Sequence, residues 1–75
     1  MEIEVHLYGA FRKLAARPVF EYRLEEGATV GELMDRLQLP DPVYRMALVN
    51  NIRVSESTRL NDGDRVHLFQ PIGGG

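Results

Sequence analysis

Hydrophobic and polar side chains alternate in three stretches of the chain. Alternation with a period of two is typical of a β-strand that buries one of its faces. In the last stretch, Val66 and Leu68 fall on one face and Phe69 falls on the other. The pattern therefore predicts three strands, over residues 2–8, 19–24 and 65–70.

Two shorter apolar runs, residues 46–49 and 52–54, flank the pair Asn50-Asn51. Asparagine tolerates the left-handed backbone conformation that a two-residue hairpin turn requires. We therefore predict a β-hairpin across these residues. The DGD sequence at residues 62–64 is expected to form a tight turn into the last strand.

The strongest helical signal lies in residues 29–37. Thr29 is followed three residues later by Glu32, which is the pattern of a capping box, where each side chain bonds the backbone N–H of the other. Apolar residues then recur with helical spacing, at Val30, Leu33, Met34 and Leu37. Pro40 and Pro42 are expected to end this helix.

A shorter helical turn is predicted within residues 9–17, where Phe11, Leu14 and Ala15 have the spacing of one helical face. The order of elements predicts an α+β fold of the β-grasp (ubiquitin-like) type. We expect a mixed sheet of four to five strands, with the first and last strands central and parallel and the main helix packed across it. Residues 1–72 would form this single domain and residues 73–75 a flexible tail.

Composition excludes several classes of function. The 75 residues contain no cysteine, which excludes a disulfide framework, a thiolate zinc site and a cysteine nucleophile. The net charge of −2 argues against nucleic-acid binding through phosphate neutralisation. No apolar run reaches the roughly 20 residues of a membrane span, and the first residues lack the pattern of a secretory signal. We therefore expect a cytoplasmic protein with neither a nucleic-acid nor a membrane partner.

Few residues are candidates for catalysis or metal binding. His6 and His67 fall on the outward faces of the first and last predicted strands, and they would lie side by side if these strands are neighbours. They form either a metal or acid–base pair or two surface histidines, and the sequence offers no third ligand nearby. Asp62 and Asp64 fit turn chemistry better than catalysis. We therefore predict that the chain is not itself an enzyme and binds no metal or cofactor.

The chain ends in three glycines, Gly73, Gly74 and Gly75. Without side chains they form a slim, flexible strip of backbone that fits a narrow channel of another protein. A free carboxylate at the tip of this strip is a group on which a partner's active site can act. The alternative is an inert terminus.

A candidate partner-binding surface lies at the base of this tail. If the first and last strands are adjacent, Tyr8, Phe69 and Ile72 cluster there with Arg12 close by. An exposed apolar cluster with a charged rim is typical of a surface that binds another protein.

Several motifs along the chain occur together in one known family. The ending reads NDGDRVHLFQPIGGG from Asn61 to Gly75, residues 47–51 read ALVNN, and the helix begins in GATVGEL at residues 27–33. In these motifs the chain resembles the MoaD/ThiS family of small ubiquitin-like sulfur-carrier proteins. The opening HLYGAFRKLA, residues 6–15, is more similar to the MoaD branch. The resemblance covers nearly the whole chain.

This resemblance implies a mechanism. An E1-like adenylating enzyme (MoeB/ThiF-like) would use ATP to activate the carboxylate of Gly75, and a sulfur donor would convert it to a thiocarboxylate. Gly73 and Gly74 would let the tail thread into a synthase, either a MoaE-like subunit or a thiazole synthase. Tyr8, Arg12, Phe69 and Ile72 would dock the body onto these partners. The third glycine leaves Gly75 and Gly74 as alternatives for the mature terminus.

The resemblance places molybdopterin biosynthesis ahead of thiamine biosynthesis as the pathway. A ubiquitin-like modifier is the first alternative, because it uses the same adenylated terminus to form an amide with a target lysine. Lys13 is the only internal lysine on which a lysine-linked chain would grow. A β-grasp interaction module with inert glycines is the second alternative.

Overall fold

The computed structural model describes residues 1–39 and 45–70. Their elements follow one another in the predicted order of strand, short helical segment, strand, helix, hairpin and strand. They are β1 (Glu2–Leu7), the 3-10 segment η1 (Gly9–Leu14), β2 (Val19–Arg23), α1 (Val30–Arg36), β3 (Met46–Val49), β4 (Ile52–Val54) and β5 (Arg65–Phe69). The predicted boundary between domain and tail, after residue 72, lies outside the described residues.

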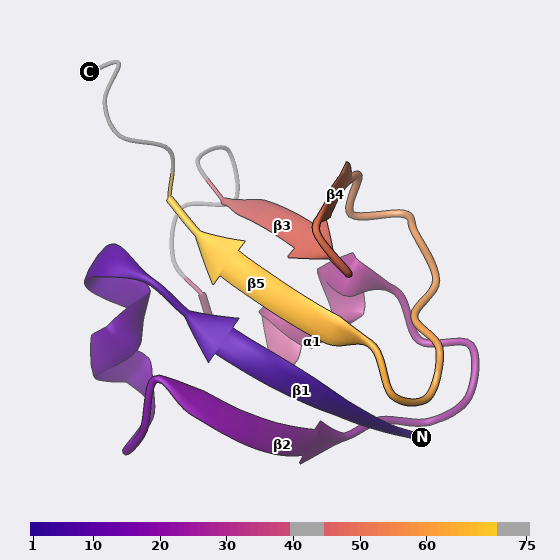
Figure 1. Cartoon of the computed structure of the whole chain (residues 1–75), viewed down its shortest axis with the longest axis horizontal. Coiled ribbons are helices and arrows are strands. Elements are labelled where there is room, and N and C mark those ends of the chain that lie inside the picture. Colours follow the sequence, from indigo (N-terminus) through magenta and orange to yellow (C-terminus); the bar gives the residue numbers. More distant parts are fainter. Residues whose placement is uncertain (40–44, 71–75) are drawn as a thin grey trace.

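The five strands form one sheet in the order β2-β1-β5-β3-β4. β1 and β5 are central and parallel, and every other neighbouring pair is antiparallel. Figure 1 looks onto one face of this sheet, with α1 behind it. The structure therefore confirms the predicted α+β fold of the β-grasp type, with five strands in a mixed sheet.

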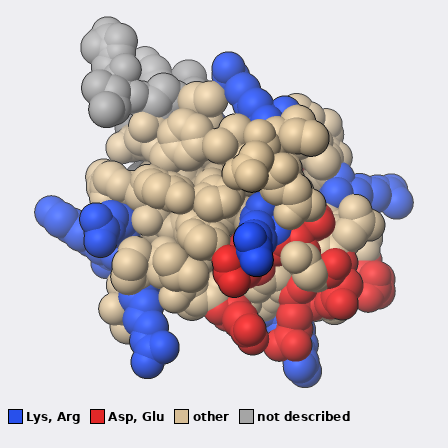
Figure 2. Space-filling view, viewed as in Figure 1, with Lys and Arg blue, Asp and Glu red and all other residues tan. Residues whose placement is uncertain are grey.

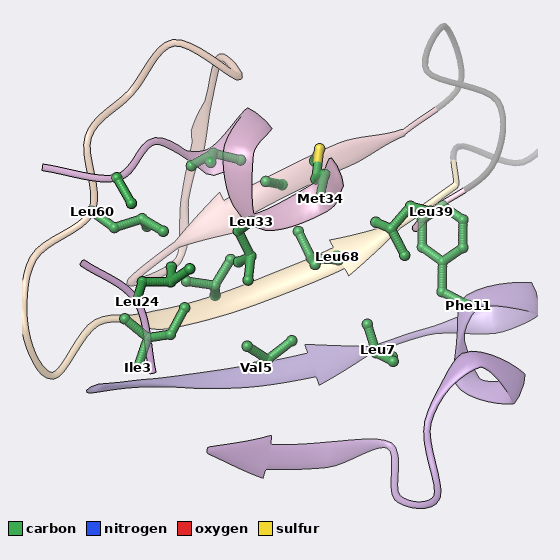
Figure 3. Packing of buried hydrophobic residues seen from close by; sticks show 14 residues of the cluster. Ile3, Val5, Leu7, Phe11, Leu24, Leu33, Met34, Leu39, Leu60 and Leu68 are labelled. Carbon is green, nitrogen blue, oxygen red and sulfur yellow. The ribbon is translucent and has the colours of Figure 1, made fainter. Parts of the chain in front are cut away.

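The core lies between the sheet and α1, as Figure 3 shows. Alternation along β1 and β5 sends every second side chain into it, because successive side chains of a strand point to opposite faces. The largest fully buried side chains are Phe11, Ile3, Leu33, Met34, Leu68, Val5, Val30 and Val66. The other face of β1 and β5 carries polar and aromatic side chains, and no described element covers it.

The start of α1 is capped as predicted. The side chain of Thr29 accepts a hydrogen bond from the backbone N–H of Glu32 (3.2 Å), and the carboxylate of Glu32 accepts one from the N–H of Thr29 (3.1 Å). These bonds satisfy two backbone donors that the first helical turn leaves free.

The end of α1 differs from the prediction, because the helix ends at Arg36, before the prolines. Gln38 adopts a left-handed conformation with φ of 59°. The N–H of Gln38 donates to the backbone carbonyl of Asp35 (3.1 Å), and the N–H of Leu39 donates to the backbone carbonyl of Met34 (3.1 Å). This is the Schellman arrangement, with glutamine in the place that glycine usually takes. Pro40 and Pro42, the predicted stop, lie outside the described residues.

The predicted hairpin between β3 and β4 is confirmed. Asn50 and Asn51 have φ angles of 51° and 71°, which are the left-handed values of a two-residue turn. Asn50 also joins this turn to the one before β5: its Nδ2 donates to Asp64 (2.9 Å), and its Oδ1 accepts from the N–H of Arg65 (3.0 Å). The two turns therefore hold each other in place.

The segment between β1 and β2 is a 3-10 helix in which only part of the predicted apolar face is buried. Phe11 is fully buried at the end of the core where Leu39 also lies (Figure 3). Leu14, which has helical spacing from Phe11, is exposed instead. The chain becomes extended at Ala15 (φ −140°, ψ 159°), which ends the helical segment.

Candidate partner-binding site at the end of β5

The candidate site begins where β1 ends. Tyr8 follows β1, and its N–H donates to the carbonyl of Leu68 on β5 (3.1 Å). Gly9 then turns the chain into η1 with φ of 56°, a left-handed conformation that favours glycine. The ring of Tyr8 therefore stays on the open face of the sheet, beside the last residues of β5.

Tyr8 and Phe69 lie together as predicted. Their rings meet edge to face, with centroids 6.3 Å apart and planes at 85°, an arrangement that aromatic pairs favour. Tyr8 is 44% exposed. Phe69 is half-buried rather than fully exposed, since it also pairs across the sheet with Met46 of β3.

Arg12 lies on η1 close to this aromatic pair. A cleft of about 300 Å³ lies where the end of β1 meets the start of β2, and Tyr8, Arg12, Pro18 and Val19 contribute to its lining. The side chain of Arg12 is exposed and forms no ion pair with another described residue. The structure thus brings together Tyr8, Arg12 and Phe69. Ile72, Gly73, Gly74 and Gly75, the other predicted site residues, lie outside the described residues.

The two histidines lie side by side, as the strand alternation predicted. His6 and His67 are direct partners in the parallel register of β1 and β5, and their rings stack with centroids 4.3 Å apart. His6 Nε2 donates to the carboxylate of Glu4 (2.6 Å), and Nδ1 of His67 is hydrogen-bonded to the hydroxyl of Tyr8 (2.7 Å). The histidine pair therefore continues the aromatic cluster along the open face.

The contacts of Glu4 and His67 shift the pKa values of both side chains. The hydrogen bond from His6 lowers the pKa of Glu4, and the nearby charge of Arg65 adds to the effect. Partial burial, and then the neighbouring ring of His6, lower the pKa of His67. Because burial and a like charge both disfavour protonation, His67 is held mainly neutral near pH 7.

Within residues 1–39 and 45–70, no group of three or more histidine, aspartate or glutamate side chains is arranged to hold a metal ion. No helix in the same residues is long and apolar enough to cross a membrane. What this end of the molecule presents is an aromatic pair, a histidine pair and an exposed guanidinium group.

Sequence reasoning missed how far this surface extends. Leu14 and Val19 are each 45% exposed and lie on the same side of the molecule, in the segment from η1 to the start of β2. One signal was available in the sequence: residues 5–20 contain Arg12, Lys13 and Arg17 and no acidic residue.

Comparison with known proteins now decides the family. A family model described as the ThiS family matches residues 5–75. The chain belongs to the ThiS family. This places it among ubiquitin-like proteins that act as small sulfur carriers and modifiers, and such carriers are not themselves catalysts.

Three relatives illustrate the range of this family. Small archaeal modifier protein 3 of Haloferax volcanii is 25% identical over 92 residues that cover 100% of both chains. A Pyrococcus furiosus structure assigned as molybdopterin converting factor, subunit 1, has a TM-score of 0.80 and 28% identity, over 96% of this chain and 99% of that one. A Helicobacter pylori complex of subunits 1 and 2 of molybdopterin-converting factor contains a chain with a TM-score of 0.67 and 25% identity, over 100% of both.

Proposed function

We propose that this chain is a sulfur carrier that works through the carboxylate of Gly75. The carboxylate attacks the α-phosphorus of ATP on an E1-like adenylating enzyme (MoeB/ThiF-like), which forms an acyl-adenylate and releases pyrophosphate. A sulfur nucleophile at the oxidation level of sulfide, supplied by a donor protein, then displaces AMP from the carbonyl carbon. The product is a thiocarboxylate at Gly75. Because the reaction consumes ATP, we expect it to take place in the cytoplasm.

The single observation that carries this proposal is the match of the ThiS family over residues 5–75, a range that includes the tail. The structure of the domain supports it in a second way. The cluster of Tyr8, Phe69 and Arg12 lies at the end of β5, from which the chain continues toward the glycines. A partner that contacts this cluster would have its active site within reach of Gly75.

The glycines and Ile72 have distinct roles in this proposal. Gly73 and Gly74 offer no side chain to obstruct a narrow channel, so the terminal carboxylate can reach a buried catalytic centre. Ile72 would add an apolar contact next to Phe69. ATP is a substrate of the partner enzyme, and the carrier itself holds no cofactor.

Molybdopterin biosynthesis is the pathway that we favour. One solved structure with 28% identity is assigned as molybdopterin converting factor, subunit 1, and another with 25% identity is a chain of a complex of subunits 1 and 2. A MoaE-like second subunit is therefore the expected acceptor of the tail. A thiazole synthase of thiamine biosynthesis is the alternative acceptor.

A modifier is the second candidate function, and the Haloferax volcanii relative, named a small archaeal modifier protein, favours it. In that case a lysine amine of a target protein would displace AMP and form an amide with Gly75. Lys13 is the only internal lysine of the chain, so lysine-linked chains would have one branching point.

ATP–pyrophosphate exchange tests the proposal. We expect the adenylating enzyme of the same organism to catalyse exchange with the full chain and to lose this activity when Gly74 and Gly75 are deleted. The expected reason is that the shortened tail leaves its new terminal carboxylate, on Gly73, out of reach of the bound ATP. Equal exchange with the full and the truncated chain would show that the glycines are inert and would contradict both the carrier and the modifier.

A further inference from the structure

The segment from Tyr8 to Val19, which runs from the end of β1 into the start of β2, exposes several large apolar side chains. Of the four large hydrophobic side chains that are exposed in the described part of the chain, three belong to this segment: Tyr8, Leu14 and Val19. Single exposed apolar side chains are ordinary, but a group on one short segment is typical of a contact surface.

The same segment carries three cations without an acidic neighbour in the sequence. Arg12, Lys13 and Arg17 are all exposed, and none forms an ion pair or a side-chain hydrogen bond with another described residue. This segment is therefore positively charged, although the chain as a whole has a net charge of −2. Figure 2 shows blue side chains and no red ones over this end of the sheet, whereas red side chains, with blue ones among them, gather toward the opposite end.

We call this surface the cationic shoulder, and define it as Tyr8, Arg12, Lys13, Leu14, Arg17 and Val19. It lies beside the end of β5, since Tyr8 bonds to Leu68 through its N–H and contacts Phe69 through its ring. Figure 1 shows η1 next to the end of β5 from which the chain runs on to its last residues. An enzyme that acts on residues beyond β5 would therefore meet the cationic shoulder beside the end of that strand.

The cleft within the shoulder indicates what kind of group fits there. Its volume of about 300 Å³ is bounded by the apolar surfaces of Pro18 and Val19, by the ring of Tyr8 and by Arg12. An aliphatic side chain that ends in a carboxylate would place its stem against the apolar walls and its charge beside the guanidinium group. Arginine is well suited to this contact, because its planar fork binds both carboxylate oxygens.

We propose that the cationic shoulder recognises an acidic surface, interspersed with apolar side chains, beside the channel of the adenylating enzyme that receives the tail. This inference rests on the proposed function and adds the chemistry of the partner surface. A protein partner is favoured over an anionic membrane because the shoulder lies beside the end of β5, the strand that precedes the glycines in the sequence. Three cations and a few side chains would also give a membrane only weak, reversible binding.

A matched pair of charge-reversal variants tests the proposal. Arg12→Glu with Arg17→Glu changes the shoulder, and Arg23→Glu with Arg59→Glu changes the net charge by the same amount at other exposed positions. The dissociation constant for the adenylating enzyme of the same organism is measured by calorimetry at low and at high salt. Unfolding in urea verifies that each variant is folded.

We expect the shoulder variant to bind at least about tenfold more weakly, because attraction becomes repulsion at the contact, and the control to change by less than about threefold. The wild-type dissociation constant should rise with salt more steeply than that of the shoulder variant. Leu14→Ser should weaken binding several-fold without changing charge.

Three results would overturn the inference. The first is equal weakening by the two charge variants, which would indicate only a long-range effect of net charge. The second is unchanged binding by the shoulder variant while the wild-type chain still supports ATP–pyrophosphate exchange, which would leave the carrier function intact. The third is sedimentation of the wild type, but not of the shoulder variant, with phosphatidylserine vesicles, together with equal enzyme binding by both.

If the wild-type chain neither binds the enzyme nor supports exchange, both proposals are wrong.

Discussion

Two clefts of nearly equal size lie at opposite ends of β1, and they differ in how their charged groups are used. The cleft at the start of β1, about 310 Å³, is lined by acidic side chains that include Glu2, Glu21 and Asp62. The cleft at its end, about 300 Å³, belongs to the cationic shoulder. Size therefore does not distinguish a binding site from a structural feature in this molecule.

The difference lies in two aspartates: Asp62, which lines the acidic cleft, and Asp64, two residues further along the chain, have internal partners, whereas Glu21 of the same cleft has none among the described residues. At the acidic end, Asp64 is buried and accepts from the N–H of Asn61 (2.8 Å) and from Asn50 (2.9 Å). Asp62 accepts from the N–H of Glu2 (2.7 Å). These carboxylates hold turns together, whereas the shoulder cations have no partner among the described residues. Charges without an internal partner are the ones available to another protein.

The largest effect on stability is expected at the acidic end. Asp64→Ala should lower the free energy of unfolding by about 2 kcal/mol, because it leaves two hydrogen-bond donors unsatisfied between two turns. Urea denaturation measures this change. Asp62→Ala is the matched control and should cost less than about 1 kcal/mol, since its single hydrogen bond is exposed. Equal costs for both variants would contradict the structural role assigned to Asp64.

A smaller effect is expected at the start of α1, where the polar groups are again used internally. Thr29→Ala should lower the free energy of unfolding by about 1 kcal/mol, because it removes the cap of the helix. Thr29→Ser keeps the hydroxyl and should lose only a fraction of this. If serine and alanine were equivalent in thermal unfolding, the capping bond would not contribute as described.

The histidine pair lies near the end of β1, where His6 lines the cleft of the shoulder, and it predicts how stability depends on pH. The pKa of His67 is lower in the folded protein than its ordinary value of 6.5, so the unfolded chain takes up a proton first as the pH falls. The free energy of unfolding should therefore decrease as the pH falls from 6.5 to the lowered pKa. Glu4 also has a lowered pKa in the folded protein, so the unfolded chain takes up a proton at this carboxylate first. The free energy of unfolding should therefore decrease further as the pH falls below 4.5.

His67→Gln is expected to flatten the decrease below pH 6.5, because it removes the titrating ring. The groups around this ring are His6, Tyr8, Glu4 and Arg65, while its partner on β3 is the uncharged Leu48. Glu4→Gln serves as a comparison and should flatten the curve mainly below pH 4.5. Urea unfolding at a series of pH values provides the measurement, and a curve that stays equally steep in His67→Gln would contradict the assignment.

The smallest effect on stability is expected at the shoulder. Arg12→Glu with Arg17→Glu should change the free energy of unfolding by less than about 0.5 kcal/mol, because neither side chain has an internal partner. The same urea experiment as for Asp64→Ala gives the comparison. A loss as large as that of Asp64→Ala would show that the shoulder supports the fold, and the contrast between the two ends would then fail.

Much of the fold could be predicted from local patterns. Alternation located the strands, the Thr29–Glu32 pair located the start of α1, and Asn50-Asn51 located the hairpin. These signals depend on residues that are near one another in the chain. They also sufficed to place Tyr8 and Phe69 together once β1 and β5 were taken as neighbours.

The rest depends on contacts that local patterns do not contain. The link from Asn50 to Asp64 joins two turns, and it exists because the β3–β5 register brings them together. Leu14 is exposed although it has helical spacing from the buried Phe11, and the end of α1 follows from the left-handed conformation of Gln38. Tyr8 and Arg12 of the shoulder were predicted, but Leu14 and Val19 were missed because they were interpreted as parts of a helix face and a strand face.

The intact mass of the chain, purified from its own host, tests the central claim most directly. The carrier function predicts a fraction in which one oxygen atom is replaced by sulfur, and this fraction should disappear when Gly75 is deleted. A free chain without sulfur, accompanied by conjugates in which Gly75 is joined to lysines of other proteins, would contradict the carrier function and favour the modifier.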